Sequence, residues 1–309
     1  MTVTTTLSFF QTFIRVAKES FPTIISMIFF SLVNQINIIF VGRSPDPLLL
    51  AGVGLGGMLI NVFCFATSQG LNGTIESFVS RDFGAGNKMK ETGLDDEGAL
   101  KKYKECGVHL NRARIIIMIV LLPVIVTFFW ADTILISLAQ DPVISTMARN
   151  YVVWSLPGII ALVQFDCRKR WLQSLFFSHV STQTQVFTTC NHVLVCYILI
   201  LKLNWGVFGA AMALNFTYGL NFLIQEIYVN VLLKERLSIY EAPLLSIESF
   251  KGWMNFLKLG VPGTLMQCFE WWAFEVLAIF AGILGTVQLA AHVAVINVCA
   301  LVFMIPLGI

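Results

Sequence analysis

The chain has 309 residues, of which 57% are hydrophobic and only 12% are charged, and its mean hydropathy is +0.78. A soluble domain has about 45–50% apolar and about 25% charged residues, so this composition excludes an ordinary soluble protein. A formal net charge of +2 argues against a nucleic-acid partner, which would require a concentrated basic face. The seven cysteines have no CxxC or Cys/His spacing, so neither a metal site nor a disulfide framework is expected.

Gaps between charged residues predict eight membrane-spanning helices, because a spanning helix needs about 20 apolar residues. The first gap lies between Glu19 and Arg43, and the second lies between Asp46 and Glu76. The other six spans are expected at 115–131, 150–173, 184–201, 206–232, after residue 258 and from about residue 287. The expected fold class is therefore an all-α membrane protein, a polytopic helical bundle.

Two of these spans contain irregular features. The second continues to Ser80, which gives about 50 Å of helix at about 1.5 Å per residue, longer than the bilayer core. It should bend or protrude, and Gly70 and Gly73 are the expected places. Pro157 lies inside the fourth span, where a membrane bundle tolerates proline if neighbouring helices satisfy the carbonyl group that it frees.

Three segments lie outside the predicted spans. Residues 1–20 combine Phe10 and Phe13 with Arg15, which predicts an interfacial helix at the N-terminus. Residues 84–111 mix charges of both signs and are expected to form a solvated loop, with or without a short helix. Residues 233–257 are expected to link the sixth and seventh spans.

The distribution of Lys and Arg predicts the orientation. The N-terminus and the segments after spans two, four and six hold 17 of the 20 basic residues. Basic residues accumulate on the cytoplasmic side, so the N-terminus and these three segments are expected there. The regular alternation also supports the number of spans, since one missed helix would disturb it.

An internal repeat is visible when the chain is shifted by 240 residues. Residues 22–69 then align without a gap on residues 262–309, with ten identities over 48 positions that include Pro22 with Pro262 and Gly42 with Gly282. Six helices separate the copies, so they are expected to be parallel repeats of a two-lobed transporter. Residues 21–232 would form one six-helix lobe and residues 258–309 the start of a second, which predicts a truncated product, a missing C-terminal lobe or a partner subunit.

Five motifs resemble those of the multidrug and toxic compound extrusion (MATE) transporters, especially the eukaryotic branch. The most specific is Glu270-Trp-Trp-Ala-Phe-Glu275, which is similar to the family's helix seven. The others are Phe40-Val-Gly-Arg, the glycine-rich stretch from Gly70 to Gly86, Arg170-Trp-Leu-Gln and Met304-Ile-Pro-Leu-Gly. The resemblance extends along essentially the whole chain and implies a transporter with alternating access.

The chain also departs from the family pattern. Ser80, Arg81 and Asp82 replace the usual Gly-Gln-Ala, and the segment that follows is longer than the family usually has. Asn37 stands where many bacterial members carry Asp, and Asn297 stands where an animal subgroup carries Glu. The resemblance therefore implies that helix seven carries the main coupling site in this chain.

The strongest candidates for coupling are the carboxylates of the seventh span. Glu270 is twelve residues past Lys258, about 18 Å along a helix, which places it near the bilayer midplane. A charged group there costs roughly 2.5–3.5 kcal/mol, so it is a candidate for binding a proton. Glu275 lies about 140° further around the helix. Trp271 and Trp272 could offer ring faces to an organic cation, although hydrogen bonds to neighbouring helices and lipid packing are the structural alternatives for these glutamates and tryptophans.

Other polar positions are candidates for lining the same cavity. Gln35 occupies the place of Glu275 in the first repeat, and Asn37 and Asn297 occupy the two positions where relatives carry acids. No cofactor is expected, and either H⁺ or Na⁺ could be the coupling ion.

A second set is expected near the inner ends of the helices. Glu76 and Arg170 are candidates for a gate or a helix-end contact, with the structural role favoured for Glu76. Asp166 stands next to Arg168 and Arg170 and suggests a salt-bridge cluster, with a snorkelling anchor as the alternative. His192 lies within a span, where a helix-packing role is favoured over a proton relay.

These features predict a secondary antiporter that exchanges organic cations or other amphiphilic compounds for protons. It would lie in the plasma membrane or in a vacuolar or vesicular membrane. A lipid-linked saccharide flippase would need a cationic cavity, whereas the span interiors are expected to hold carboxylates and no Arg or Lys. A non-transporting structural subunit is the remaining alternative. An enzyme is not expected, because no Ser/His/Asp, Cys/His or metal-ligand set is present.

Overall fold

The computed structural model describes residues 9–44, 47–93, 95–138, 140–243, 246–284, 295–296, 298–299 and 302–308. Within these ranges the chain is helical and contains no strand, as the sequence predicts. The α-helices are α1 (Phe9–Val41), α2 (Pro47–Leu59), α3 (Ala66–Thr92), α4 (Asp96–Thr127), α5 (Ala131–Ser137), α6 (Pro142–Ser174), α7 (Ser178–Cys196), α8 (Gly206–Ile227), α9 (Lys234–Leu237) and α10 (Trp253–Leu284).

Three π-helical segments and three 3₁₀ turns extend or connect these helices. The π segments are Ile60–Phe65, Tyr197–Lys202 and Tyr228–Leu232, and the 3₁₀ turns are Phe128–Trp130, Ser238–Tyr240 and Ile247–Phe250. They are labelled η1, η3 and η4 for the π segments, and η2, η5 and η6 for the turns.

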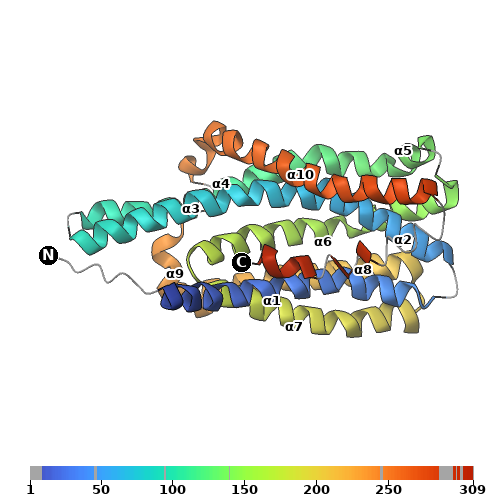
Figure 1. The fold of residues 1–309 in the computed structure, drawn as a ribbon, viewed down its shortest axis with the longest axis horizontal. Coiled ribbons are helices and arrows are strands. Elements are labelled where there is room, and N and C mark those ends of the chain that lie inside the picture. The colour runs from blue at the N-terminus through green and yellow to red at the C-terminus, as the bar shows by residue number, and fades with distance from the viewer. Residues whose placement is uncertain are drawn as a thin grey trace.

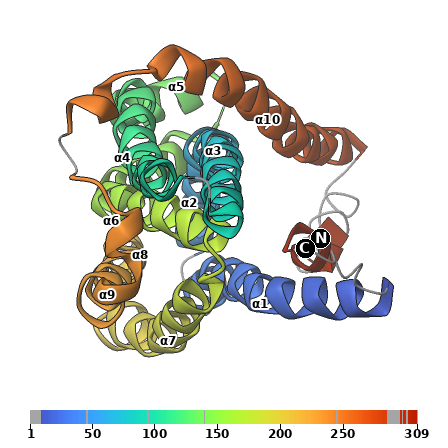
Figure 2. The same ribbon diagram turned by 90° about the vertical axis from the view of Figure 1, so that its left-hand side faces the viewer.

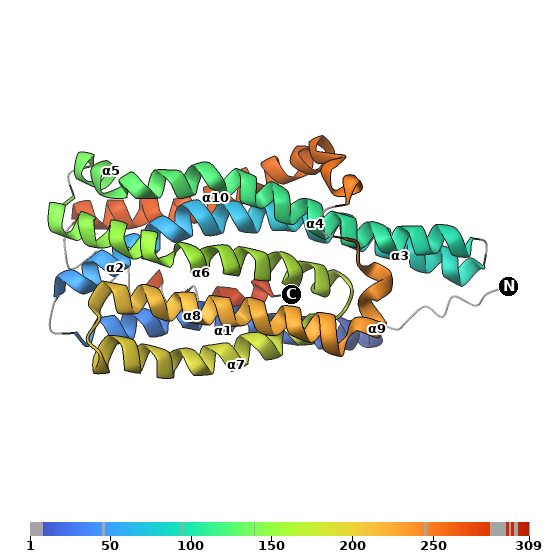
Figure 3. The same cartoon turned by 180° about the vertical axis from the view of Figure 1, so that it is seen from behind.

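The helices run side by side along one axis, and α6 lies in the middle of the bundle (Figure 1). Seen from one end, α1, α7 and α8 lie on one side of α6 and α4, α5 and α10 lie on the other (Figure 2). The view from behind shows α8 and α7 in front and the α3–α4 hairpin projecting beyond the other helices (Figure 3). The start of α1, the α3–α4 connection, the α6–α7 connection and α9 all lie at the same end of the bundle (Figure 1). The four segments that are rich in Lys and Arg therefore share one end, as their alternation predicts.

Five helices of the described chain are long and apolar enough to cross a membrane, fewer than the eight spans expected from charge gaps. They are Val16–Val41, Leu48–Thr92, Asp96–Ser137, Ser178–Lys202 and Gly206–Leu232. The fourth expected span is the central helix α6, several of whose polar residues are buried inside the bundle. The seventh expected span is α10, and most of the eighth lies outside the described residues.

The long second span is irregular at a different place from the one expected. The π segment Ile60–Phe65 interrupts it, and α3 then continues through Gly70 and Gly73. A π segment changes the helix direction because one extra residue is inserted per turn. Gly70 instead allows α3 and α10 to pack closely, because a Cβ atom at this position would overlap Thr264 of α10. The span also protrudes, because α3 extends to Thr92.

The predicted loop at 84–111 is wrong. This segment forms the end of α3 and the start of α4, joined only by a short turn around Gly93 and Asp95. Gly93 adopts a φ of +60°, which ends α3, and the Asp95 side chain accepts a hydrogen bond from the Gly98 N–H at 2.7 Å, which caps α4. The mixed charges hid the signal of α4, whose buried residues Ala99, Tyr103, Cys106 and Leu110 recur at helical spacing.

Two further boundaries differ from the sequence prediction. The described part of residues 1–20 is no separate element, because α1 begins at Phe9 and runs without interruption into the first span. The expected linker at 233–257 ends earlier, since α10 begins at Trp253. Gly252, with a φ of +74°, sets the start of that helix.

A neighbouring helix bonds the backbone of α6 directly beside Pro157. Asn215 of α8 accepts a hydrogen bond from the Gly158 N–H and donates one to the Trp154 carbonyl oxygen, both at 2.7 Å. The carbonyl group that Pro157 frees belongs to Val153, one residue earlier, so the expected partner for that group stays a prediction. The sequence gives Asn215 as part of an Asn-Phe-Thr sequon, but in the structure it is a packing residue of the bundle.

Replacing Asn215 with Leu should lower the stability of the folded protein by about 1–3 kcal/mol, because two backbone groups of α6 lose their partners. The thermal transition of the purified protein in detergent measures the effect. Asn191→Leu is the matched control, since Asn191 is only half-buried and its amide bonds only within its own helix. Equal transitions for the Asn215 and Asn191 variants would contradict the bridging role.

Candidate functional site

A buried polar core joins α1, α6, α7 and α8. Its members are Asn37, Tyr151, His192, Cys196 and Thr217, and none is more than 3% exposed. The Asn37 amide donates to the Tyr151 hydroxyl at 3.0 Å, and the His192 Nδ1 lies 2.8 Å from the Thr217 hydroxyl. The Cys196 thiol lies 3.2 Å from the His192 Nε2 and 3.8 Å from the Asn37 Oδ1. The predicted cavity residue Asn37 is therefore fixed in the interior of the bundle.

The hydrogen bonds of this core place a proton on the His192 Nδ1 atom. The Thr217 hydroxyl donates to the Ala213 carbonyl oxygen at 2.9 Å, so it can only accept from the His192 Nδ1–H. The Nε2 atom faces the Cys196 thiol, so both ring nitrogens have a partner inside the bundle. This agrees with the helix-packing role expected for His192. The core contains no carboxylate, so in this form it holds no group that is readily ionised.

A ladder of polar side chains continues along α7 and α8. The Thr188 hydroxyl donates to the Asn221 Oδ1 at 2.6 Å, and the Gln225 Nε2 donates to the Ser181 hydroxyl at 2.7 Å. All four residues are buried. Hydrogen bonds of this kind hold helices together where lipid provides no hydrophobic driving force between them.

The gate candidates form two separate contacts. The Arg170 guanidinium donates to the Glu76 carboxylate at 2.7 Å and also contacts Gln69, so α6 is tied to α3. Asp166 accepts from the Asn72 amide at 2.7 Å. The Glu76–Arg170 pair borders a cavity of about 330 Å³ that Leu307 and Gly308 also line.

The expected cluster of Asp166 with Arg168 and Arg170 is wrong for the described residues. Arg168 points to the other side of α6, where it pairs with Glu226 at 2.8 Å and with Glu241 at 3.1 Å. Arg168 lies about 200° around the helix from Asp166 and from Arg170, whereas Asp166 and Arg170 are four residues apart and share the face that meets α3. Arg114 contacts the same Glu226. The resulting ion cluster of Arg114, Arg168, Glu226 and Glu241 was missed, although Glu226 is the only charged residue of its span.

The expected coupling residues lie on α10, which packs along α3 (Figures 1 and 2). The Glu270 side chain is exposed and makes no hydrogen bond or ion pair with any described residue. Trp271 is half-buried, and the Trp272 indole N–H donates to the Val62 carbonyl oxygen at 3.5 Å. The Glu275 side chain and the whole of Asn297 lie outside the described residues.

The proposed sharing of one cavity by Gln35 and Glu275 stays a prediction. Gln35 is half-buried on α1, whereas α10 follows α3. In Figure 2 the described C-terminal residues lie between α1 and α10. The structure therefore brings Asn37 together with Tyr151, and Glu76 together with Arg170, but it does not bring these pairs together with Glu270.

One interior cation contradicts the expectation that the spans hold no Arg or Lys. Lys169 of α6 is 2% exposed, and its Nζ lies 3.9 Å from the Met27 sulfur and 6.0 Å from the Phe30 ring centroid. No described carboxylate lies within ion-pair distance of it. The sequence assigned the Arg168–Arg170 run to a helix end, and only the packing of α6 against α1 shows that its middle residue turns inward.

Comparisons with known proteins agree with this fold. The MatE family model matches residues 22–92 and 98–198. Multidrug and toxin extrusion protein 2 of Oryctolagus cuniculus is 29% identical over 260 residues, which cover 84% of this chain and 40% of that protein. Protein DETOXIFICATION 10 of Arabidopsis thaliana is 29% identical over 286 residues, which cover 90% of this chain and 54% of that protein.

The same relation appears among solved structures. The crystal structure of the eukaryotic MATE transporter AtDTX14 superposes with a TM-score of 0.80 at 23% identity, covering 96% of this chain and 63% of that chain. At this identity the likeness describes the fold. The chain spans about half the length of the curated relatives it matches.

Proposed function

The chain belongs to the MatE family, whose members are transporters and not enzymes, and from this premise we propose that the protein is a secondary antiporter. It exports small organic cations or other amphiphilic compounds in exchange for protons or sodium ions. It is a multi-pass integral membrane protein. The antiport activity is proposed for the whole protein.

The observation that carries this proposal is the position of Glu270. It is an exposed carboxylate within the 32-residue helix α10, with no cationic partner among the described residues. A charge without a partner in the middle of an apolar helix is costly unless it has a function. A carboxylate can hold either a proton or a cation, so binding of one excludes the other.

The polar core of α1, α6, α7 and α8 supports placing the coupling step on α10. The core offers an amide, a phenol, a thiol and an imidazole, all with partners. None of these is an acid that would release a proton near neutral pH in a buried site. Glu270 and Glu275 are thus proposed as the coupling residues, with Trp271 and Trp272 as aromatic surfaces for the cation.

The orientation is part of the proposal. The basic ends of α1, α3, α4, α6 and α9 lie together at one end of the bundle (Figure 1). The positive-inside rule assigns that end, and hence the N-terminus, to the cytoplasm.

The test is export of a fluorescent organic cation from vesicles that contain the full-length protein. Export should follow an imposed proton gradient or an imposed sodium gradient, and the two are applied separately. Vesicles with either gradient but without the protein are the control. Absence of export with both gradients would contradict the antiporter and favour the non-transporting subunit.

A second candidate, a flippase for a lipid-linked saccharide, is favoured by Lys169. An interior ammonium group without a carboxylate partner could contact a phosphate. This candidate requires that a fluorescent lipid phosphate changes leaflet in the same vesicles. If only the organic cation moves, Lys169 is a packing residue.

A further inference from the structure

A groove of about 700 Å³ lies outside the predicted transport site, between the polar part of α4, α3 and the turn Ile247–Phe250. We call this groove, from Glu97 to Arg112 along α4, the α4 groove. Its charged lining residues on α4 recur at Glu97, Lys101, Lys104, Glu105 and Arg112, which is close to helical spacing, so they share one face of the helix. The apolar part of α4 starts three residues after Arg112, at Ile115. The groove therefore ends at the level of the membrane surface.

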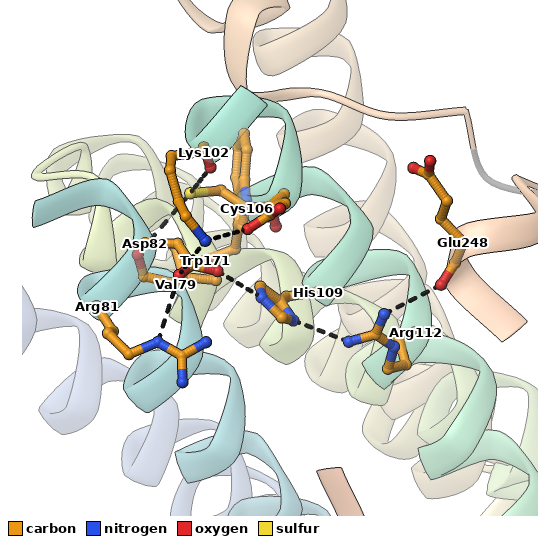
Figure 4. A network of polar contacts seen from close by, with 10 residues as sticks. Val79, Arg81, Asp82, Lys102, Cys106, His109, Arg112, Trp171 and Glu248 are labelled. Atoms are coloured by element: carbon orange, nitrogen blue, oxygen red, sulfur yellow. Dashed lines mark hydrogen bonds and ion pairs between the residues drawn. The ribbon is translucent and has the colours of Figure 1, made fainter. Parts of the chain in front are cut away.

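Part of the charge in this groove is neutralised internally. Buried Asp82 of α3 accepts from His109 at 2.8 Å and forms ion pairs with Arg81 at 3.3 Å and Lys102 at 3.4 Å (Figure 4). Lys102 also pairs with Glu105 at 2.6 Å. Two carboxylates thus balance two cations.

Arg112 is not balanced in this way. Its guanidinium donates to the His109 Nδ1 at 3.1 Å and to the Glu248 carbonyl oxygen at 3.0 Å. Because His109 Nδ1 accepts this bond and Nε2 donates to Asp82, the imidazole is neutral. The Glu248 carboxylate points away from Arg112 (Figure 4). The buried Arg112 Nε atom has no hydrogen-bond partner among the described residues.

The rest of the groove has more positive than negative charge. Lys101, Lys104 and Lys251 form no ion pair with any described residue, and with Arg112 they make four cations. Glu97 and Glu248 are the two carboxylates of the lining without a cationic contact in the described chain. Four cations against two carboxylates leave an excess of two positive charges. A half-buried guanidinium with only neutral partners is a position that favours an anion.

Three exposed apolar side chains lie close in the chain to the lining residues Glu248 and Lys251. Ile247 is 75% exposed, Phe250 50% and Met254 65%, and each is within three residues of one of these two lining residues. A soluble anion would gain nothing from these side chains. A phospholipid would gain from both, since its phosphate would meet the basic residues and its acyl chains would cover the apolar ones.

We propose that the α4 groove binds the headgroup phosphate of an anionic phospholipid, with Arg112, Lys104 and Lys251 as its contacts and Phe250 beside its acyl chains. The ligand belongs to the leaflet that meets this end of the bundle. The site lies apart from Glu270 and does not depend on the proposed antiport, so either can fail without the other.

Spin-labelled phosphatidylserine in phosphatidylcholine vesicles containing the full-length protein tests this site. The measured quantity is the preference of protein-bound label for phosphatidylserine over phosphatidylcholine. Each basic residue near an anionic lipid surface contributes about fivefold to binding, so Lys104→Gln with Lys251→Gln should lower the preference by about 25-fold. Neither lysine makes an ion pair with a described residue, so the fold should tolerate both changes.

Lys88→Gln with Lys90→Gln is the matched control. Both lysines are exposed on α3 in the same hairpin but do not line the groove. An equal loss in the control would overturn the proposal, because the preference would then depend on overall charge. An unchanged preference in the Lys104 and Lys251 variant would overturn it as well.

Glycerophosphoserine, which carries the headgroup without acyl chains, separates a lipid from a soluble phosphate ester. It should displace the spin-labelled lipid only weakly. Full displacement at equal concentration would overturn the lipid assignment in favour of a soluble ligand.

Arg112→Lys should keep part of the preference for phosphatidylserine and Arg112→Gln should lose it, since Lys retains the charge but not the planar fork of the guanidinium group.

Discussion

Replacing Glu270 with Gln is expected to lower gradient-driven export of an organic cation by between about 5-fold and 150-fold, the range that a coupling free energy of about 1–3 kcal/mol spans. The amide has nearly the same shape but binds neither a proton nor a cation by charge. Glu270 is exposed on α10 and has no described partner, so its loss should not unfold the bundle. The loss of export would then reflect the coupling step itself.

The measurement is the initial rate of export at several external pH values in vesicles holding the full-length protein. Glu235→Gln on α9 is the control, since this exposed carboxylate lies at the polar end of the bundle. It should leave the rate and its pH dependence unchanged. If Glu270→Gln and Glu275→Gln both keep the wild-type rate and pH dependence, the proposed mechanism is wrong.

Replacing Glu226 with Leu should destabilise the folded protein by about 3 kcal/mol, the lower end of the cost of breaking a buried ion pair. Glu226 contacts both Arg114 and Arg168, and the three side chains are 17%, 12% and 7% exposed. Arg168 would keep Glu241 at 3.1 Å, whereas Arg114 would lose its carboxylate. A partly buried guanidinium without an anion is the source of the cost.

The thermal transition of the purified protein in detergent measures this effect. Glu91→Leu is the control, because Glu91 is exposed near the tip of the α3–α4 hairpin and should change stability by less than about 0.5 kcal/mol. Combining Glu226→Leu with Arg114→Leu should recover part of the loss, since the stranded charge is removed. A Glu226 variant as stable as the control would show that the cluster contributes nothing.

The sequence was sufficient for the helical class and for the approximate positions of the apolar spans. Backbone groups in lipid must bond within their own segment, so long apolar stretches can only be helices. Charged residues mark the ends because they remain in water, which explains why the segments around Lys88, Arg170 and Lys234 lie at one end of the bundle. The same rule failed at 84–111, because it relies on long apolar stretches. There the available signals were the helical spacing of Ala99, Tyr103, Cys106 and Leu110, and Gly93 and Asp95 at the helix ends.

The candidate site was predictable as a set of positions but not as a set of contacts. Glu270 follows from its depth in an apolar segment, and Asn37 from the family resemblance. The bond from Asn37 to Tyr151 joins residues 114 positions apart, and the bond from Arg170 to Glu76 joins residues 94 positions apart. No spacing rule within one helix reaches across such distances.

The sequence by itself determined that this protein lies in a membrane, roughly where its apolar spans are and which ends are basic, because these properties depend on local hydropathy and charge. The tertiary structure decided that α6 is central, that Lys169 faces inward and that Arg168 and Arg170 pair on opposite sides. These outcomes depend on which neighbouring helix meets each face of α6. A helix has several faces for one sequence, and only packing selects the partner of each face.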